Sequence, residues 1–316
     1  MAEFQCDVIA IGLSPLQEPY LEALRELTSG RLVGIDRNPD APGAAVVDEV
    51  HAADYADVSS VLRCLERWPV DRAWRLFSAS SQLSLRALAS IGERTGAPFP
   101  TVASIDAVLD KSLLYRSLRG SGLPIPRTIN VSAPEELSRA VSDFFASGSE
   151  SVFVKSDWSK NPNYVFQIQD PSGMSSIDVT WVRDDRFHGT YVVQEAIEGA
   201  SVRLNVLGQG VDDYVAFDFA TGQRWPSNRT AGLVKRNFHR GVQDLISNFG
   251  LRRFIVKIDV IVDSGDNPLA VLDIGLDPPS RLQREAQSDS IHALDRFLQE
   301  YCYRFLVEDE GALLHR

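Results

Sequence analysis

The stretch FIVKIDVIVDSGDNPLAVLDIGLD, residues 254–277, indicates the fold of this 316-residue chain most clearly. Two apolar runs, 254–262 and 270–274, predict a pair of strands, and the turn-forming residues between them predict a hairpin-like connection. Asp259 alternates with apolar neighbours in the first strand, so we expect its side chain to project from one face of the sheet. Asp273 stands in the second strand. Carboxylates on neighbouring strands can hold a magnesium ion between them.

The region before this hairpin predicts an antiparallel-rich arrangement. Strand-like hydrophobic runs follow one another, and a single helix is predicted over 232–248. The strand-like runs are 151–155, 164–168, 190–195, 202–207 and 214–219.

The first hundred residues alternate strand and helix signals instead. A first apolar strand ends in Gly12, and Ser14, Pro15 and Gln17 then predict a helix start with a capping box. The repeated alternation predicts a parallel sheet with right-handed crossovers, a Rossmann-like half. The first turn has one glycine and no GxGxxG pattern, so Asp36, at the end of the second strand, is weak support for a dinucleotide site. A purely structural α/β layer is the stronger interpretation.

Composition narrows the classes of function. The net charge of −11 argues against a nucleic-acid partner or a polybasic membrane patch. Three scattered cysteines and five scattered histidines show neither zinc-ligand spacing nor a disulfide framework. The N-terminus has no basic leader, and no run approaches the ~18 apolar residues of a membrane span. We therefore expect a soluble, cytoplasmic protein with small-molecule substrates and no nucleic-acid or membrane partner.

Four segments in a fixed order carry the chemistry. The first contains Lys111, the second is a strand ending in Lys155, the third spans 192–199, and the fourth is the hairpin with its two aspartates. Two lysines from different elements can hold phosphate oxygens as point charges. An apolar strand–loop segment can sandwich an adenine, and carboxylates can hold the magnesium that neutralises charge in phosphoryl transfer. The pattern predicts a triphosphate clamp.

On these segments the chain resembles the ATP-grasp enzymes of the carboxylate–amine ligase group, over nearly its whole length. Its first hundred residues resemble the Rossmann-like domain that precedes ATP-grasp in biotin carboxylase and in the carbamoyl-phosphate synthase subunit, on segments 33–42 and 47–49. Residues 273–280 are similar to the metal strand, and the Pro-Ser that follows it, in the ligase of pyrrolysine biosynthesis.

The resemblance implies an α/β fold in three parts. These are a Rossmann-like domain (1–100), an ATP-grasp small subdomain (101–190) and a large subdomain with the metal strands (191–316), the last two with antiparallel sheets. ATP and Mg²⁺ are the implied cofactors. The implied reaction activates a carboxylate, which we expect to belong to an amino acid, as an acyl phosphate. An amine substrate then attacks it, and ADP and phosphate are released.

The resemblance also assigns roles to individual residues. Those implied to bind ATP are Lys111, Lys155, Gln194, Glu195, Ala196 and Ile197. Lys160, in the phosphate-covering loop that lacks glycine, is a further candidate for binding the phosphates. The implied metal ligands are Asp259 and Asp273, and Asp277 or a water is the candidate for the third ligand. Arg253 is implied to contact the acyl phosphate or the substrate. Lys235 is a separate candidate from the basic residues between 224 and 240, which could face a carboxylate substrate or the triphosphate. For Lys235, which lies in a basic cluster, a solvated helix face is the alternative.

Three departures from the family pattern keep other functions open. Gly275 stands where the metal strand has an asparagine, the phosphate-covering loop 156–163 has no glycine, and Ala200-Ser201 replace the acid that holds the ribose. The alternatives are a weakened or non-catalytic relative serving as a binding or partner subunit, a kinase or carboxylating enzyme on the same frame, and a nicotinamide-dependent dehydrogenase. The apolar face predicted for a helix over 291–306 is compatible with a core helix or a homodimer interface.

Overall fold

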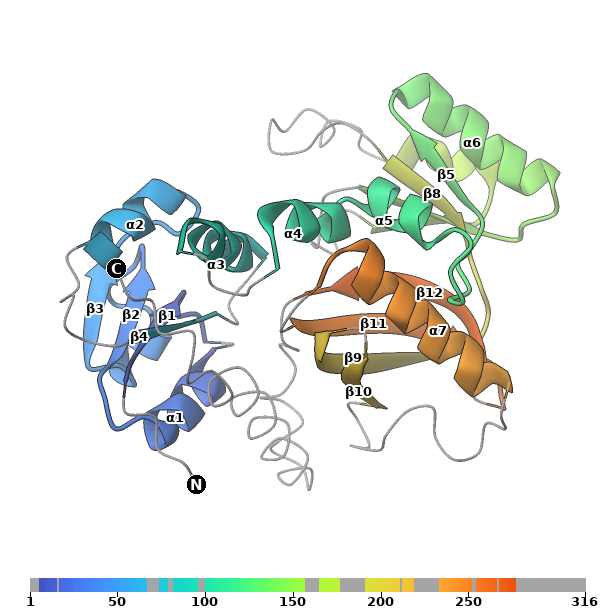
Figure 1. Ribbon diagram of the computed structural model, residues 1–316. Coiled ribbons are helices and arrows are strands. Elements are labelled where there is room, and N and C mark those ends of the chain that lie inside the picture. The colour runs from blue at the N-terminus through green and yellow to red at the C-terminus, as the bar shows by residue number, and fades with distance from the viewer. Residues whose placement is uncertain are drawn as a thin grey trace.

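The computed structural model contains three four-stranded sheets (Figure 1). The residues it describes are 6–15, 17–66, 74–78, 82–95, 100–156, 165–176, 191–210, 212–218, 233–251, 254–265 and 267–276. The predicted helix over 291–306 lies outside them. Within the described part, no helix combines the length and the apolar character that crossing a membrane requires.

The first sheet is parallel throughout and confirms the predicted Rossmann-like arrangement. Its strands are β1 (Asp7–Ile11), β2 (Leu32–Asp36), β3 (Glu49–Ala52) and β4 (Trp74–Phe77). They lie in the order β3-β2-β1-β4, and every neighbouring pair runs parallel. The connecting helices are α1 (Glu18–Leu27), η1 (Pro42–Ala45), α2 (Val58–Glu66) and α3 (Gln82–Thr95). Strands β1 and β2 are buried along their whole length, because helices cover a parallel sheet on both faces.

The predicted start of the first helix is wrong. Helix α1 begins at Glu18, and Gln17 is its N-cap residue without a side-chain capping bond. The Gln17 side chain is fully buried and donates from Nε2 to the carbonyl of Gly12 instead. A buried backbone carbonyl needs a donor, and supplying it outweighs the local capping preference of the sequence.

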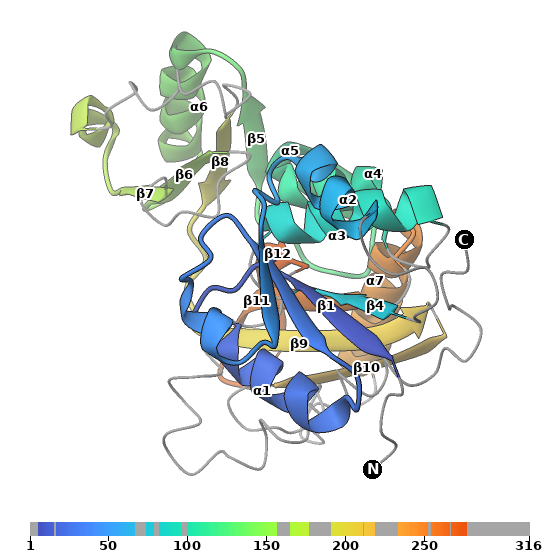
Figure 2. The same ribbon diagram turned by 90° about the vertical axis from the view of Figure 1, so that its left-hand side faces the viewer.

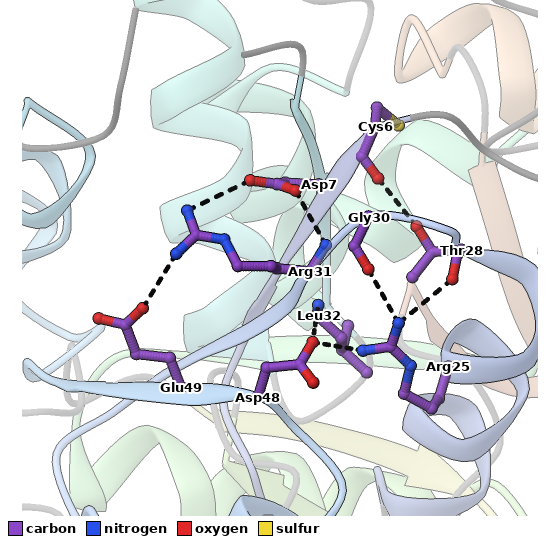
Figure 3. A network of polar contacts seen from close by, with 9 residues as sticks. All are labelled: Cys6, Asp7, Arg25, Thr28, Gly30, Arg31, Leu32, Asp48 and Glu49. Carbon is purple, nitrogen blue, oxygen red and sulfur yellow. Dashed lines mark hydrogen bonds and ion pairs between the residues drawn. The ribbon is translucent and has the colours of Figure 1, made fainter.

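Ion pairs tie together the starts of the parallel strands (Figure 3). Arg31 lies between Asp7 on β1, at 3.4 Å, and Glu49 on β3, at 3.3 Å. Arg25 at the end of α1 pairs with Asp48, whose carboxylate also accepts the Leu32 N–H at 2.8 Å. Ligands of open α/β sheets bind outside the opposite, carboxyl ends of the strands, so this network has a structural role.

The second sheet is antiparallel and has a core of its own. Its strands are β5 (Thr128–Val131), β6 (Val152–Ser156), β7 (Val165–Ile168) and β8 (Tyr191–Glu195), in the order β5-β8-β6-β7. Helix α6 (Pro134–Ala146) packs on one face through a separate hydrophobic cluster, and η3 (Pro171–Ser176) follows β7. Because β8 pairs with both β5 and β6, this sheet extends past the predicted boundary at residue 190.

The third sheet contains the hairpin predicted from residues 254–277. Its strands are β9 (Ala200–Gly210), β10 (Asp213–Asp218), β11 (Phe254–Val262) and β12 (Pro268–Gly275), in the order β10-β9-β11-β12, all antiparallel. Helix α7 (Leu233–Asn248) contributes Phe238, Val242 and Leu245 to its core. The predicted strand 254–262 and the hairpin connection are confirmed, with Asp263 accepting the backbone N–H of Gly265 and of Asn267 in the turn.

Two short helices, α4 (Val102–Leu109) and α5 (Lys111–Leu118), join the three sheets. Their apolar residues, among them Ile105, Leu109 and Leu114, belong to one hydrophobic cluster that also contains residues of β1 and β11. Figure 1 shows α5 between the second sheet and strand β12, a place that its contacts with β8 and α7 support. The turned view of Figure 2 shows the second sheet at the upper left, away from the first and third sheets.

Candidate active site

The second sheet presents a polar face on the side opposite helix α6. Val152 and Val154 of β6 and Val193 of β8 pack into the α6 cluster. Since successive side chains of a strand alternate between faces, Lys155 and Gln194 point to the other side. Both are buried, with exposed fractions of 8% and 1%.

The third sheet presents a matching polar face. Ile258 and Val260 on β11 are fully buried in the shared core, so the Asp259 between them projects to the opposite face. Cross-strand pairing places Asp259 directly beside Asp273 of β12 and beside Arg203 of β9. The two aspartates predicted as metal ligands are therefore neighbours on one surface.

Contacts between the elements bring the two polar faces together. The carbonyl of Leu272 on β12 accepts a hydrogen bond from Lys155 Nζ at 3.2 Å and another from the Tyr115 hydroxyl. Lys111, the first residue of α5, lies 3.4 Å from Asp273, measured from Nζ to Oδ1. Both predicted phosphate lysines thus converge on strand β12, next to a predicted metal ligand.

The charges of this cluster influence one another. Burial lowers the pKa of the Lys155 ammonium to about 8, and the carboxylate of Asp273 partly opposes that shift. The positive charge of Lys111 lowers the same pKa further, whereas Asp259 raises it. Burial, and next the Asp273 carboxylate, raises the pKa of the Tyr115 hydroxyl. A buried lysine with incomplete compensation gains stability when an anion binds beside it, which suits the site to a phosphate.

Several polar groups of the predicted adenine-binding segment already form hydrogen bonds within the protein. Gln194 Nε2 donates to Thr128 Oγ1 at 3.0 Å, while its Oε1 atom is buried without a hydrogen-bond partner. Glu195 accepts the Arg127 N–H at 2.6 Å, and the Ala196 N–H donates to the Ser151 carbonyl at 3.1 Å. Ile197 is half-buried, in the link between β8 and β9.

Other predicted site residues fall outside what the structure describes. Lys160, Arg253 and Asp277 are not among the described residues, and Lys235 lies in α7 without a described side chain. Across the described ranges, no group of three or more histidine, cysteine, aspartate or glutamate side chains is close enough to hold a metal ion.

Arg203 is a site residue that the sequence argument did not identify. Its Nε lies 2.6 Å from Asp259 Oδ1 and its Nη2 lies 2.8 Å from Oδ2, a bidentate ion pair. Arg203 and Asp259 are 56 positions apart in the sequence. The sequence predicts the strand over 202–207 that contains Arg203. Only the pairing of β9 with β11 shows which of its residues lies beside Asp259.

The first sheet supports the structural interpretation of Asp36. Its two carboxylate oxygens accept the backbone N–H of Leu13 at 2.8 Å and of Asn38 at 2.9 Å. Leu13 is fully buried over Gly34, where a Cβ would come within 2.6 Å of the leucine Cδ1. The turn after β1, where a dinucleotide would bind, is thus closed by a leucine and tied down by Asp36.

Comparisons with known proteins identify the fold. No family model matches the chain, and no curated protein matches it by sequence. The biotin carboxylase domain of 2-oxoglutarate carboxylase from Hydrogenobacter thermophilus, solved as a dimer with MgADP, ADP and bicarbonate, has a TM-score of 0.70 at 13% identity and covers 95% of this chain and 70% of its own. N5-carboxyaminoimidazole ribonucleotide synthetase from Thermotoga maritima has a TM-score of 0.64 at 12% identity, with coverages of 94% and 76%.

A third solved structure, phosphoribosylglycinamide synthetase from Anaerococcus prevotii, has a TM-score of 0.60 at 14% identity and covers 87% of this chain and 68% of its own. These likenesses confirm the predicted resemblance in fold to the ATP-grasp enzymes, together with a biotin-carboxylase-like first domain. The similarity to the ligase of pyrrolysine biosynthesis stays a prediction.

Proposed function

We propose that this protein is an ATP-dependent carbon–nitrogen ligase that forms ADP. One observation carries the proposal: two buried lysines from different elements, Lys111 and Lys155, converge with Asp273 between two antiparallel sheets. A buried lysine is uncommon unless it has a partner. Neither apolar packing nor the local fold requires two of them here, and the single carboxylate of Asp273 lies beside both, so a triphosphate would supply further negative charge.

In the proposed reaction a substrate carboxylate oxygen attacks the γ-phosphorus of ATP, and the bond to the ADP oxygen breaks. The substrate amine then attacks the acyl carbon, phosphate leaves, and the amine loses a proton. Lys111 and Lys155 hold the phosphates in line as charge shifts toward ADP. We expect the carboxylate to belong to an amino acid.

The residues present fit magnesium at one of the two predicted strand positions. Asp273 offers a half-exposed carboxylate beside Lys111, where it can share an ion with the phosphates. A bound Mg²⁺ would neutralise phosphate charge during the transfer. Asp259 is already engaged at both oxygens by Arg203. Asp277 remains a proposed ligand.

We also propose the β8–β9 link as the adenine site. The buried Gln194 Oε1, which has no hydrogen-bond partner, supports a ligand donor such as the adenine amino group nearby. One oxygen of the Glu195 carboxylate, Oε1, accepts the Arg127 N–H, so this residue would help to position β8 beside the base.

The first experiment is calorimetric titration of a non-hydrolysable ATP analogue with Mg²⁺, followed by a screen of amino-acid and amine pairs for ADP release. We expect Lys155→Met and Lys111→Met to abolish ADP release, while Arg63→Gln on exposed α2 leaves it unchanged. Turnover retained in both lysine variants would refute the residue assignment.

The Arg203–Asp259 ion pair favours a second candidate, an ATP-binding relative without turnover that serves as a partner subunit. Nucleotide binding without ADP release from any substrate pair would support it. ADP release with a defined pair would exclude it, and a phosphorylated small molecule as the product would indicate a kinase instead.

A further inference from the structure

The pair between Arg203 and Asp259 lies at the position expected to bind a metal ion. Both guanidinium contacts, at 2.6 and 2.8 Å, run along the outer edge of the carboxylate, one to each oxygen. The two residues are also direct cross-strand neighbours in the antiparallel β9–β11 ladder. The register of the two strands therefore holds the ion pair in place, although the two residues are 56 positions apart in the sequence.

This geometry disfavours a cation at Asp259. A magnesium ion needs carboxylate lone pairs at ~2.1 Å and usually retains several waters. Here the bidentate edge of the carboxylate is occupied, and the guanidinium places a permanent positive charge beside it. A divalent ion bound at Asp259 would have to displace Arg203 or tolerate that charge at close range.

The described charges of the site balance differently from those of a site with two metal ions. Lys111, Lys155 and Arg203 provide three positive charges, and Asp259 and Asp273 provide two negative ones. Three cationic groups among the described residues can attract a polyphosphate and reduce the need for a second divalent ion.

We propose that the Arg203 guanidinium takes the place of a metal ion at Asp259, so that the nucleotide binds with one divalent ion. The inference rests on the proposed nucleotide-binding function. It assigns Arg203 a positioning role: neutralised by Arg203, Asp259 holds a fixed cation at the side of the phosphates, and the divalent ion binds on the Asp273 side.

The test counts ions with Mn²⁺ in place of Mg²⁺. Full-length protein is titrated with Mn²⁺ at saturating non-hydrolysable ATP analogue, free Mn²⁺ is measured by electron paramagnetic resonance, and bound nucleotide is quantified in the same samples. We expect one Mn²⁺ per bound nucleotide in the wild type. We expect two in Arg203→Gln, because Asp259 then becomes an available ligand, and one in Arg203→Lys and in the distant control Arg63→Gln.

A second variant tests whether Asp259 pairs only with Arg203 or also binds the metal ion. If it pairs only with Arg203, Asp259→Asn keeps one Mn²⁺ with an affinity within about 3-fold of wild type. A metal ligand would lose 10-fold or more on the same change. If Arg203→Gln does not fold, as judged by circular dichroism, the double variant Arg203→Gln/Asp259→Asn removes both charges together and is expected to bind one ion.

Two Mn²⁺ per nucleotide in the wild type, one in folded Arg203→Gln, or a 10-fold loss of Mn²⁺ affinity in Asp259→Asn would each overturn the inference. A wild-type protein that binds no nucleotide at any Mn²⁺ concentration refutes the proposed function itself, and with it the inference. The two failures are distinct, because bound nucleotide and bound ion are measured separately.

Discussion

Replacing Lys155 by methionine should make the free protein more stable at neutral pH and make it bind nucleotide less well. Methionine has nearly the length of lysine without its charge. The lysine is 8% exposed, and its ammonium contacts the Leu272 carbonyl at 3.2 Å. Burial of that charge, which the Asp273 carboxylate offsets only in part, destabilises the folded state, so the variant loses this penalty.

The magnitude follows from the pKa of Lys155, which burial lowers from 10.5 to about 8. At ~1.36 kcal/mol per pH unit, the charged lysine destabilises the fold by about 3 kcal/mol at pH 7. Methionine also loses the hydrogen bond to Leu272, worth about 1 kcal/mol. The variant should therefore gain roughly 2 kcal/mol in its free energy of unfolding at pH 7.

The lowered pKa of Lys155 fixes the sign of the pH dependence of stability. Between pH 8 and 10.5 the unfolded lysine holds its proton while the folded lysine has lost it, so wild-type stability rises with pH in this window relative to the variant. Below pH 8 both states are protonated and the full penalty is present. The advantage of Lys155→Met should therefore fall from roughly 2 kcal/mol at pH 7 to near zero by about pH 10.

The assay is urea unfolding followed by circular dichroism at pH 7 and pH 10, together with calorimetric titration of the ATP analogue. Loss of a charged contact to phosphate should weaken binding roughly 10- to 100-fold. Lys111→Met is the matched comparison: it removes a buried partner of Asp273 and should lower stability by about 1–3 kcal/mol. A Lys155→Met protein that is less stable than wild type at pH 7, or whose difference from it is the same at both pH values, would refute the reasoning.

Three further changes test other parts of the structure. Tyr115→Phe removes the hydroxyl bond to the Leu272 carbonyl and should lower the free energy of urea unfolding by about 1 kcal/mol; an unchanged midpoint would contradict that bond. Gly199 and Gly148 both have a positive φ, so alanine strains the backbone at either position. Gly199→Ala also places a Cβ 2.5 Å from a β11 backbone oxygen and should cost more than ~1 kcal/mol, whereas Gly148→Ala, with open space around it, should cost less; equal losses in thermal melts would count against this packing. Asp36→Ala should lower stability by about 1–3 kcal/mol and leave ATP-analogue affinity unchanged, and a calorimetric loss of affinity would reopen a ligand role for this residue.

Several elements could be predicted because their pattern is local. Strand β11 spans the same residues as the run that predicted it, since one face of an antiparallel strand is buried and its apolar residues alternate with the others. Strands β3 and β5 were not predicted, because most of their residues are exposed or half-buried and lack apolar alternation. The predicted start of α1 was wrong because the Gln17 side chain donates to the buried carbonyl of Gly12 and does not cap the helix. No local sequence pattern indicates such a partner.

The sequence by itself determined the order of the layers and the types of groups that carry charge. Periodicity separates the parallel first third from the antiparallel remainder, and a lysine that ends an apolar strand identifies a buried charge. Only the tertiary structure decided what those charges touch. The register of β9 against β11 pairs Arg203 with Asp259, and the place of α5 brings Lys111 to Asp273. Strand register and helix docking depend on contacts between distant segments, so a run of residues cannot specify its own partner.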